Sequence, residues 1–249
     1  MREFIIYDRF KSGYTMNFFE RYIPIFLLII VILAIYLLKD KIRKNLSLDR
    51  YIRGTLVIIN IFITLFYYIG RWSYIGINME TLPFHLCYLC NIFSIIILIN
   101  KDRRIYGFLV FCGILGGISS LISIDVTLSS SYLKYYYFII SHLNIIIVPL
   151  YFSIIHRYSL SSKMIIRSFI YLQGLGILMG IINYYFGSNY FFVSFTSNIA
   201  AKGTILEALG NGYDYFINLE ILSVIYLFFC LLINNSFKKM DKFLLKYII

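Results

Sequence analysis

The sequence predicts an all-α protein, a polytopic transmembrane helical bundle of about seven spans. Of its 249 residues, 60% are hydrophobic and only 14% are charged, whereas soluble domains are roughly 45–50% apolar and about 25% charged. The apolar residues also gather in runs that reach or approach the roughly 17–25 residues a helix needs to cross a bilayer. The seven runs are Tyr22–Leu38, Gly54–Gly70, Leu82–Ile99, Ile105–Ile124, Tyr135–Ile155, Ser168–Gly187 and Phe216–Ile233.

Each run is apolar on all sides, as lipid-embedded helices are. Isoleucine and aromatic residues dominate the runs; they are poor helix formers in water, but a backbone in lipid must satisfy its own hydrogen bonds. The first run follows residues 1–21, where aromatic and charged residues alternate, so we expect an interfacial segment there. The third run has Thr81 or Leu82 as a cap and Pro83 in its first turn. The sixth contains the Gly176–Gly180 pair, a small-residue packing site.

Lysine and arginine indicate the orientation. The net charge is +11, and 16 of the 23 Lys and Arg residues lie after the first, third and fifth runs or in the tail 234–249. We expect these segments to be cytoplasmic, with residues 22–233 as the membrane domain and the N-terminus outside the cell membrane. The four basic residues of segment 1–21 favour the opposite orientation. Because the charges form short clusters between apolar runs, we expect membrane lipids as partners, no nucleic acid and no cofactor.

Ionisable residues inside membrane helices are rare and usually functional. His85, His142 and Glu220 lie in or near the runs, and the expected orientation places all three in the outer half of the bilayer. Together with Cys87 they are the expected catalytic residues. Further polar residues near that level are expected to bind substrate: Arg71, Asn183, Asp125 and Asn60. The alternative is that these side chains serve helix packing alone. We expect His156, at the cytoplasmic end of the fifth run, to be an interfacial residue without a special role.

Cys87 belongs to a set of side chains with the chemistry of a nucleophilic site. A thiol, an imidazole such as His142 and an orienting carboxylate such as Glu220 are its parts, and the open amides at the start of the third run could hold an oxyanion. Alternatively, Cys87 and Cys90 are small buried apolar residues. Zinc at His85, Cys87 and Cys90 is disfavoured, because positions 85 and 87 of one helix point about 200° apart. We therefore expect no metal.

Three blocks of the sequence carry a family resemblance. They are Leu82-Pro83-Phe84-His85-Leu86-Cys87; the glycine-rich stretch Gly113–Gly117 followed by Asp125, Tyr135–Phe138 and His142; and Asn189–Phe192 followed by Thr204–Gly210. These blocks resemble the YwaF-type integral membrane proteins of bacteria, which are related to the animal transmembrane protein 164. The resemblance covers roughly residues 82–216. It departs from the family pattern at Ile124, where a proline usually precedes the acidic residue, and in lacking the lysine–proline and tryptophan–proline pairs of the third block.

The resemblance implies an activity. The animal relatives are acyltransferases that move a polyunsaturated acyl chain onto ether lysophospholipids with a cysteine and a histidine. The family histidine corresponds to His142. The family cysteine corresponds to Phe84, which cannot act as a nucleophile, so Cys87, one turn along on the same face, is the candidate replacement.

Three functions are compatible with these features. The first is a lipid acyltransferase or hydrolase in which Cys87 attacks an ester carbonyl, His142 shuttles the proton, and His85 or helix-end amides stabilise the oxyanion. The second is a transporter or channel for a small solute, with Pro149 and the glycines of the fourth and sixth runs as candidate helix breaks. The third is a non-catalytic membrane scaffold.

Overall fold

The computed structural model describes residues 4–5, 16–124, 131–194, 201 and 204–248, and within these ranges it contains helices and turns but no strand. The α-helices and the π-helical segment η3 are, in chain order, α2 (Phe18–Leu37), α3 (Lys39–Lys44), α4 (Leu46–Ile75), α5 (Leu86–Asn100), α6 (Arg103–Phe108), η3 (Leu109–Ile114), α7 (Leu115–Ile122), α8 (Tyr132–Ile154), α9 (Ser162–Phe186) and α10 (Gly212–Ile248). Short 3-10 turns occur at η2 (Met79–Thr81), η4 (Tyr190–Phe192) and η5 (Ile205–Leu209).

The predicted all-α membrane bundle is confirmed. In the described part of the chain, 6 helices are long and apolar enough to cross a membrane. Four of them are α2, α4, α8 and α9, and a fifth is the part of α10 from Gly212 to Ser236. The sixth is the continuous stretch Arg103–Ile122, which consists of α6, η3 and α7. The third predicted run corresponds to α5, an apolar helix of 15 residues that is shorter than the others. Each of the seven runs therefore forms a helix.

The start of α5 differs from the prediction. The helix begins at Leu86 with His85 as its N-cap residue, so the expected cap at Thr81 or Leu82 is wrong. The Thr81 hydroxyl is used in the preceding turn, where it accepts from the Asn78 N–H at 3.0 Å and donates to the Asn78 carbonyl at 2.9 Å. Pro83 also disfavours helical backbone at the residue before it. His85 therefore precedes the helix, and Cys87 lies in its first turn.

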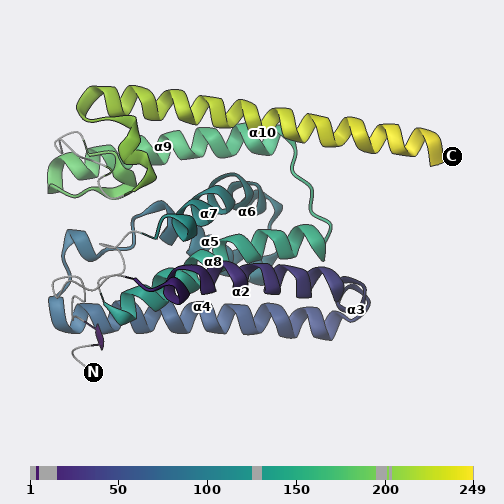
Figure 1. The fold of residues 1–249 in the computed structure, drawn as a ribbon, viewed down its shortest axis with the longest axis horizontal. Coiled ribbons are helices and arrows are strands. Elements are labelled where there is room, and N and C mark those ends of the chain that lie inside the picture. Colours follow the sequence, from purple (N-terminus) through teal and green to yellow (C-terminus); the bar gives the residue numbers. More distant parts are fainter. Residues whose placement is uncertain (1–3, 6–15, 125–130, 195–200, 202–203, 249) are drawn as a thin grey trace.

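The helix α8 lies at the centre of the bundle. It packs against α2, α4, α5, η3 and α7, and 72% of its apolar stretch is buried. Figure 1 shows α9 and α10 side by side along one edge, with α2 and α4 at the opposite edge. In α10 the buried share of the apolar stretch is 0%. Buried polar side chains therefore include several on the facing surfaces of α4, α5 and α8, among them Asn60, Ser94 and Asn144.

A π-helical segment, η3, interrupts the span Arg103–Ile122. The wider turn displaces backbone groups from their regular i to i+4 partners, and such groups need another partner when they are buried. The Tyr226 hydroxyl of α10 donates to the Phe111 carbonyl of η3 at 2.8 Å. This bond ties α10 to the centre of the molecule.

Close packing of α7 on α8 depends on Gly117, which gives a testable prediction. A Cβ atom at Gly117 would lie 2.6 Å from Cγ1 of Ile146, whereas one at Gly116 would meet nothing within 4 Å. Overpacking of this kind costs about 1–3 kcal/mol, so we expect Gly117→Ala to lower the Tm of the purified protein by roughly 2–10 °C. Gly116→Ala is the matched control and leaves the Tm unchanged or slightly higher. Equal Tm values for the two variants would contradict the close approach.

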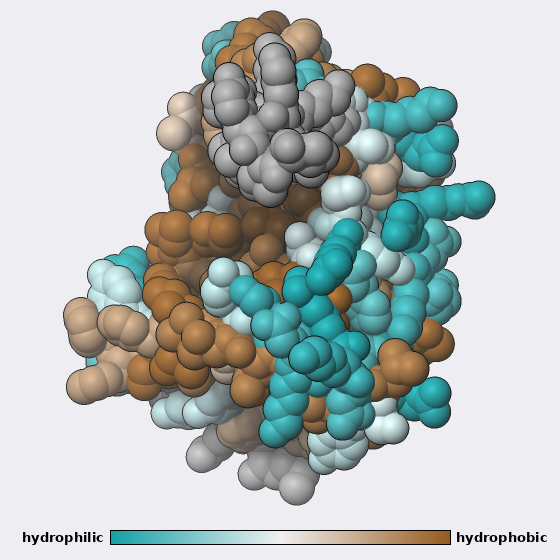
Figure 2. All heavy atoms as spheres, turned by 90° about the vertical axis from the view of Figure 1, so that its right-hand side faces the viewer, coloured by the Kyte–Doolittle hydropathy of each residue, from teal (hydrophilic) through white to brown (hydrophobic). Residues whose placement is uncertain are grey.

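Basic segments gather at one end of the bundle. Figure 2 shows hydrophilic side chains covering much of the end face at which α3 lies. The last turn of α3 contributes Lys41, Arg43 and Lys44, and the Arg43 guanidinium donates to the Ile154 carbonyl at the end of α8 through Nε at 3.1 Å. The loops that the sequence predicts to be cytoplasmic thus meet at one end of the molecule.

Candidate functional site

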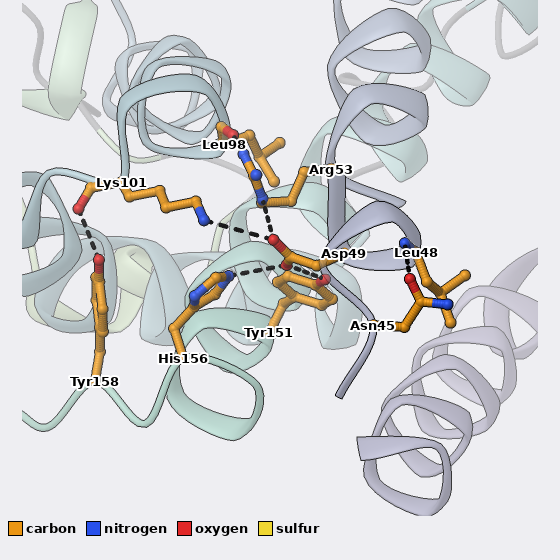
Figure 3. Close-up of polar contacts among 9 residues, drawn as sticks. All are labelled: Asn45, Leu48, Asp49, Arg53, Leu98, Lys101, Tyr151, His156 and Tyr158. Atoms are coloured by element: carbon orange, nitrogen blue, oxygen red, sulfur yellow. Dashed lines mark hydrogen bonds and ion pairs between the residues drawn. The ribbon is translucent and has the colours of Figure 1, made fainter. Parts of the chain in front are cut away.

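A connected group of charged and polar side chains surrounds Asp49, near the start of α4 (Figure 3). Asp49 is only 3% exposed. Its Oδ1 accepts from the Tyr151 hydroxyl at 2.7 Å and lies 2.9 Å from Nε2 of His156. Its Oδ2 accepts from Nε of Arg53 at 3.1 Å and lies 3.5 Å from Nζ of Lys101. We call these five residues the Asp49 cluster.

Local sequence places the members of this cluster. The Asn45 side chain caps α4 by accepting from the Leu48 N–H at 3.0 Å, and Asp49 and Arg53 follow one turn apart on the same face. Arg53 also donates through its terminal nitrogen to the Leu98 carbonyl near the end of α5. Because Tyr151 belongs to α8, the cluster fastens three helices together at one point. Both oxygens of the buried carboxylate are fully used, as a buried charge requires.

His156 makes this cluster sensitive to pH. Burial lowers the pKa of His156 below its ordinary value of 6.5, because desolvation disfavours the charged ring; Asp49 acts in the opposite direction, and Lys101 and Arg53 add to the lowering. The unfolded chain therefore binds the proton more readily than the folded protein. The contribution of neutral His156 to the free energy of unfolding is therefore fully present above pH 6.5, and it decreases as the pH falls below that value towards the lowered pKa.

The corresponding prediction is a modest loss of thermal stability in acid. We expect the Tm of the wild type to fall between pH 7 and pH 5, and we expect part of that fall to disappear in His156→Gln, because the amide can still donate to Asp49 but does not titrate. Thermal unfolding of both proteins across this range measures the effect. Identical pH profiles would show that His156 does not contribute.

At the opposite end of α4, Arg71 lies beside a group of stacked tyrosines. Its guanidinium donates to the Tyr67 hydroxyl at 3.0 Å. The Tyr67 ring stacks on Tyr137 of α8 with ring centroids 4.1 Å apart, and Tyr88 of α5 contacts Tyr137 at 5.7 Å. With Tyr68, which contacts all three of these rings, they form what we call the tyrosine cluster. Arg71, which is expected to bind substrate, thus uses one of its N–H groups in a hydrogen bond within the bundle.

His85 and Asn183 are brought together through Tyr190. Asn183 is fully buried; its amide donates to the Tyr190 carbonyl and its oxygen accepts from the Tyr190 N–H, both at 2.8 Å. The Tyr190 ring contacts the His85 ring at 5.1 Å and the Phe84 ring at 5.4 Å. His85 also contacts Tyr88 of the tyrosine cluster at 5.9 Å. Asn183 therefore orders the loop after α9, which covers the start of α5.

His142 lies on a different face of α8. It is 2% exposed, and its Nδ1 lies 2.7 Å from the Phe138 carbonyl one turn earlier. A carbonyl can only accept, so Nδ1 carries the proton and Nε2 keeps the lone pair. No hydrogen bond to Nε2 occurs among the described residues. Phe138 and Ile146, one turn to either side, belong to an apolar cluster that includes Leu121 of α7 and packs against Leu28 of α2.

The remaining expected catalytic residues are not joined to His142. Glu220 is on the exposed side of α10, where it accepts from Nε2 of Gln173 on α9 at 2.7 Å; within the described ranges it forms no ion pair or hydrogen bond with a histidine. Cys87 is half-buried and forms no disulfide, and no hydrogen bond joins it to His142 within the described ranges.

Asn60 and Asp125 are the two other residues expected to bind substrate. Asn60 is 0% exposed, and neither the oxygen nor the nitrogen of its amide group has a hydrogen-bond partner among the described residues. Asp125 lies outside the described residues. Across the described ranges, there is also no group of three or more His, Cys, Asp or Glu side chains that could hold a metal ion.

Sequence reasoning missed the Asp49 cluster, although a signal was available. Asn60, Thr64, Tyr67 and Arg71 share one face of α4, and continuing that face toward the start of the helix at intervals of seven and eleven residues reaches Arg53 and Asp49. His156 was expected to have no special role, and that prediction is wrong, because its ring bonds directly to the buried carboxylate.

The helices are long and apolar enough to cross a membrane, and polar side chains are buried among them. These features define a polytopic integral membrane protein. The model of the TMEM164 family matches residues 15–233. The chain therefore belongs to the TMEM164 family. This match supports the part of the resemblance that concerns transmembrane protein 164; the YwaF-type bacterial branch stays a prediction. No curated protein and no solved structure matches the chain.

Proposed function

We propose that the protein acts on membrane lipids by transferring or hydrolysing an acyl chain, with His142 as the general base. The observation that supports this proposal most strongly is the geometry of the imidazole. Nδ1 is anchored at 2.7 Å to the Phe138 carbonyl, which fixes the tautomer and leaves a lone pair on Nε2, as a general base requires. The Phe138 carbonyl thus takes the orienting role that the sequence suggested for Glu220.

In the proposed reaction, Nε2 of His142 accepts the proton of a hydroxyl group, either that of a lysophospholipid or that of water. The hydroxyl oxygen attacks the ester carbonyl of a donor lipid, and the tetrahedral intermediate collapses as the donor's ester bond breaks. The imidazolium then returns the proton to the departing alkoxide. A lysophospholipid acceptor gives acyl transfer, and water gives hydrolysis.

The surroundings of His142 suit an acyl chain. The apolar cluster next to it includes residues of α7 and α8 and extends to Leu28 of α2. Only 17% of the apolar stretch of α2 is buried, so this helix exposes most of its surface to lipid. A donor chain lying along α2 and α7 would contact this apolar cluster.

Cys87 belongs to a second form of the same proposal. If the reaction proceeds through a thioester, the Cys87 sulfur attacks the donor ester, the ester C–O bond breaks, and the departing alkoxide takes up the thiol proton, while backbone amides at the start of α5 hold the oxyanion. The hydroxyl of the acceptor then attacks the thioester, and the thiol is released with the acceptor's proton. The two side chains must then come closer than the structure places them. Cys87→Ala separates the two routes: retained transfer indicates direct attack by the hydroxyl, and lost transfer with unchanged folding indicates the thioester.

The family resemblance adds support, because the histidine of the animal acyltransferases corresponds to His142. We also propose that the chain belongs to the bacterial YwaF-type branch and lies in the cell membrane, with the N-terminus outside and the hydrophilic end face of Figure 2 in the cytoplasm.

Lipid profiling by mass spectrometry tests the proposal in cells. Cells that express the wild type should differ from cells lacking the chain in the acyl composition or lysolipid content of at least one phospholipid class, and cells that express His142→Gln should resemble those lacking it. Indistinguishable profiles with and without the wild type would reject the proposal. The membrane content of each protein is the control.

A further inference from the structure

Polar side chains follow the facing surfaces of α4, α5 and α8 from one end of the bundle to the other. On α4 these positions are Asp49, Arg53, Asn60, Thr64, Tyr67 and Arg71; on α5 they are Asn91, Ser94 and the Leu98 carbonyl; on α8 they are Tyr137, Ser141, Asn144 and Tyr151. Successive positions are three, four or seven residues apart, which keeps each set on one face of its helix. We call this set the polar seam.

Hydrogen bonds fix the register of α4 against α5 on either side of the middle. Toward the Arg71 end, the Asn91 amide of α5 donates to the Thr64 hydroxyl of α4 at 3.2 Å. Toward the Asp49 end, Arg53 of α4 donates to the Leu98 carbonyl of α5. Asn60 and Ser94 lie between these two bonds, one on each helix, and therefore share a level.

The helix α8 contributes Asn144 at the same level. Tyr137 contacts the Tyr67 and Tyr88 rings, and Tyr151 donates to Asp49, so both face α4 or α5. Asn144 is seven residues from each of them, which places it within about 20° of the same direction. Asn60, Ser94 and Asn144 thus approach one another from three helices.

These middle residues are buried, and each has at least one polar atom without a hydrogen-bond partner among the described residues. Asn60 and Ser94 are 0% exposed, Asn91 is 1% exposed and Asn144 is 4% exposed. Within the part of the chain that the structure describes, no hydrogen-bond partner is found for either amide atom of Asn60, the Asn91 Oδ1, the Ser94 hydroxyl or the Asn144 Nδ2. An unpaired buried polar group is costly, and here several of them occur at neighbouring levels of one seam.

We propose that the middle of the polar seam is a binding site for ordered water molecules, held by Asn60, Asn91, Ser94 and Asn144. The site offers amide donors together with amide and hydroxyl oxygens, and water satisfies both kinds of group at once. The inference does not depend on lipid chemistry at His142, because that side chain lies on another face of α8.

Charge excludes a cation as the occupant. The seam contains the guanidinium groups of Arg53 and Arg71, with Lys101 at one end, against the single carboxylate of Asp49. A metal ion in the middle would be repelled from both directions, and it would find only neutral ligands there. Water carries no charge and avoids this penalty.

Replacement of Asn60 by leucine distinguishes a hydrated site from a dry one. If water bonds to the amide, Asn60→Leu breaks those bonds, and we expect the Tm to fall by about 5 °C. If the site is dry, removing an unpaired buried amide at nearly constant volume raises the Tm, which would overturn the proposal. An unchanged Tm would overturn it as well.

Radiolytic hydroxyl-radical footprinting of the purified full-length protein reports the water directly. Bound water activated by X-rays oxidises neighbouring side chains, so we expect Tyr137 to be modified although it is 2% exposed. Phe111 of η3, 1% exposed in the apolar core, is the internal control and should stay unmodified. In the double variant Asn60→Leu, Asn144→Leu the labelling of Tyr137 should fall several-fold. Equal labelling in the variant, or none in the wild type, would reject the site.

Discussion

Replacing Asp49 by asparagine is expected to destabilise the folded protein severely. The substitution leaves Arg53 and Lys101 without a counter-charge in a place where the Asp49 side chain is 5% exposed and that of Arg53 is 11% exposed. Removing one partner of a buried ion pair typically costs about 3–5 kcal/mol, which corresponds to a decrease in Tm of roughly 10 °C for a chain of this length. Thermal unfolding of the purified protein in detergent measures the change.

The chain supplies a matched control for this experiment. Asp40 pairs with Arg43 at 3.6 Å, but its side chain is 73% exposed. An exposed pair of this kind contributes less than about 1 kcal/mol, so Asp40→Asn should leave the Tm nearly unchanged. If Asp49→Asn does not fold, Tyr151→Phe, which removes one bond to the carboxylate, should show a smaller decrease of the same sign. Equal Tm values for wild type, Asp40→Asn and Asp49→Asn would contradict the role of the cluster.

Acyl transfer is expected to fall by about 10²–10⁴-fold in His142→Gln, the usual contribution of a general base. Glutamine can still donate to the Phe138 carbonyl, so the anchoring bond is kept while the proton acceptor is lost. The readout is the rate of labelled product formation by the purified proteins. Because the change concerns one buried side chain, Tm should be measured in parallel to separate lost chemistry from lost folding.

A chemical rescue makes the prediction about His142 specific. In His142→Gly the side chain is replaced by space for a free imidazole, and added imidazole should restore part of the rate. A base role predicts rescue that increases with pH as the fraction of neutral imidazole increases. A packing role predicts none, even if imidazole restores the Tm.

The helices could be predicted from the sequence because the formation of each one depends on the residues of a single apolar run. A run of apolar residues in lipid has to be helical, and each run therefore appears as a helix. The boundary at α5 was harder to predict, because Thr81 is used by Asn78 in a turn that no capping rule anticipates. The spacing of residues within one helix predicts which of them share a face. Which other helix that face contacts depends on how the helices pack.

The site residues illustrate the same limit. Topology assigned His85, His142 and Glu220 a common depth, yet depth does not fix direction around the bundle. Glu220 bonds to Gln173 because α10 packs on α9, whereas His142 shares a face of α8 with Phe138 and Ile146, which belong to the cluster beside α2 and α7. The Asp49 cluster combines residues from the start of α4, the end of α5 and the end of α8, and only three-dimensional packing brings these segments together.

The most direct test of the proposed function is acyl exchange by the purified protein in vesicles of defined composition. The vesicles contain a diacylphospholipid with an isotope-labelled acyl chain and an unlabelled ether lysophospholipid, and mass spectrometry follows the label. We expect the wild type to move the label onto the lysophospholipid or to release it as fatty acid, and we expect folded His142→Gln to do neither above background. Label that stays in the donor with the wild type, or moves equally fast with His142→Gln, would contradict lipid chemistry at His142.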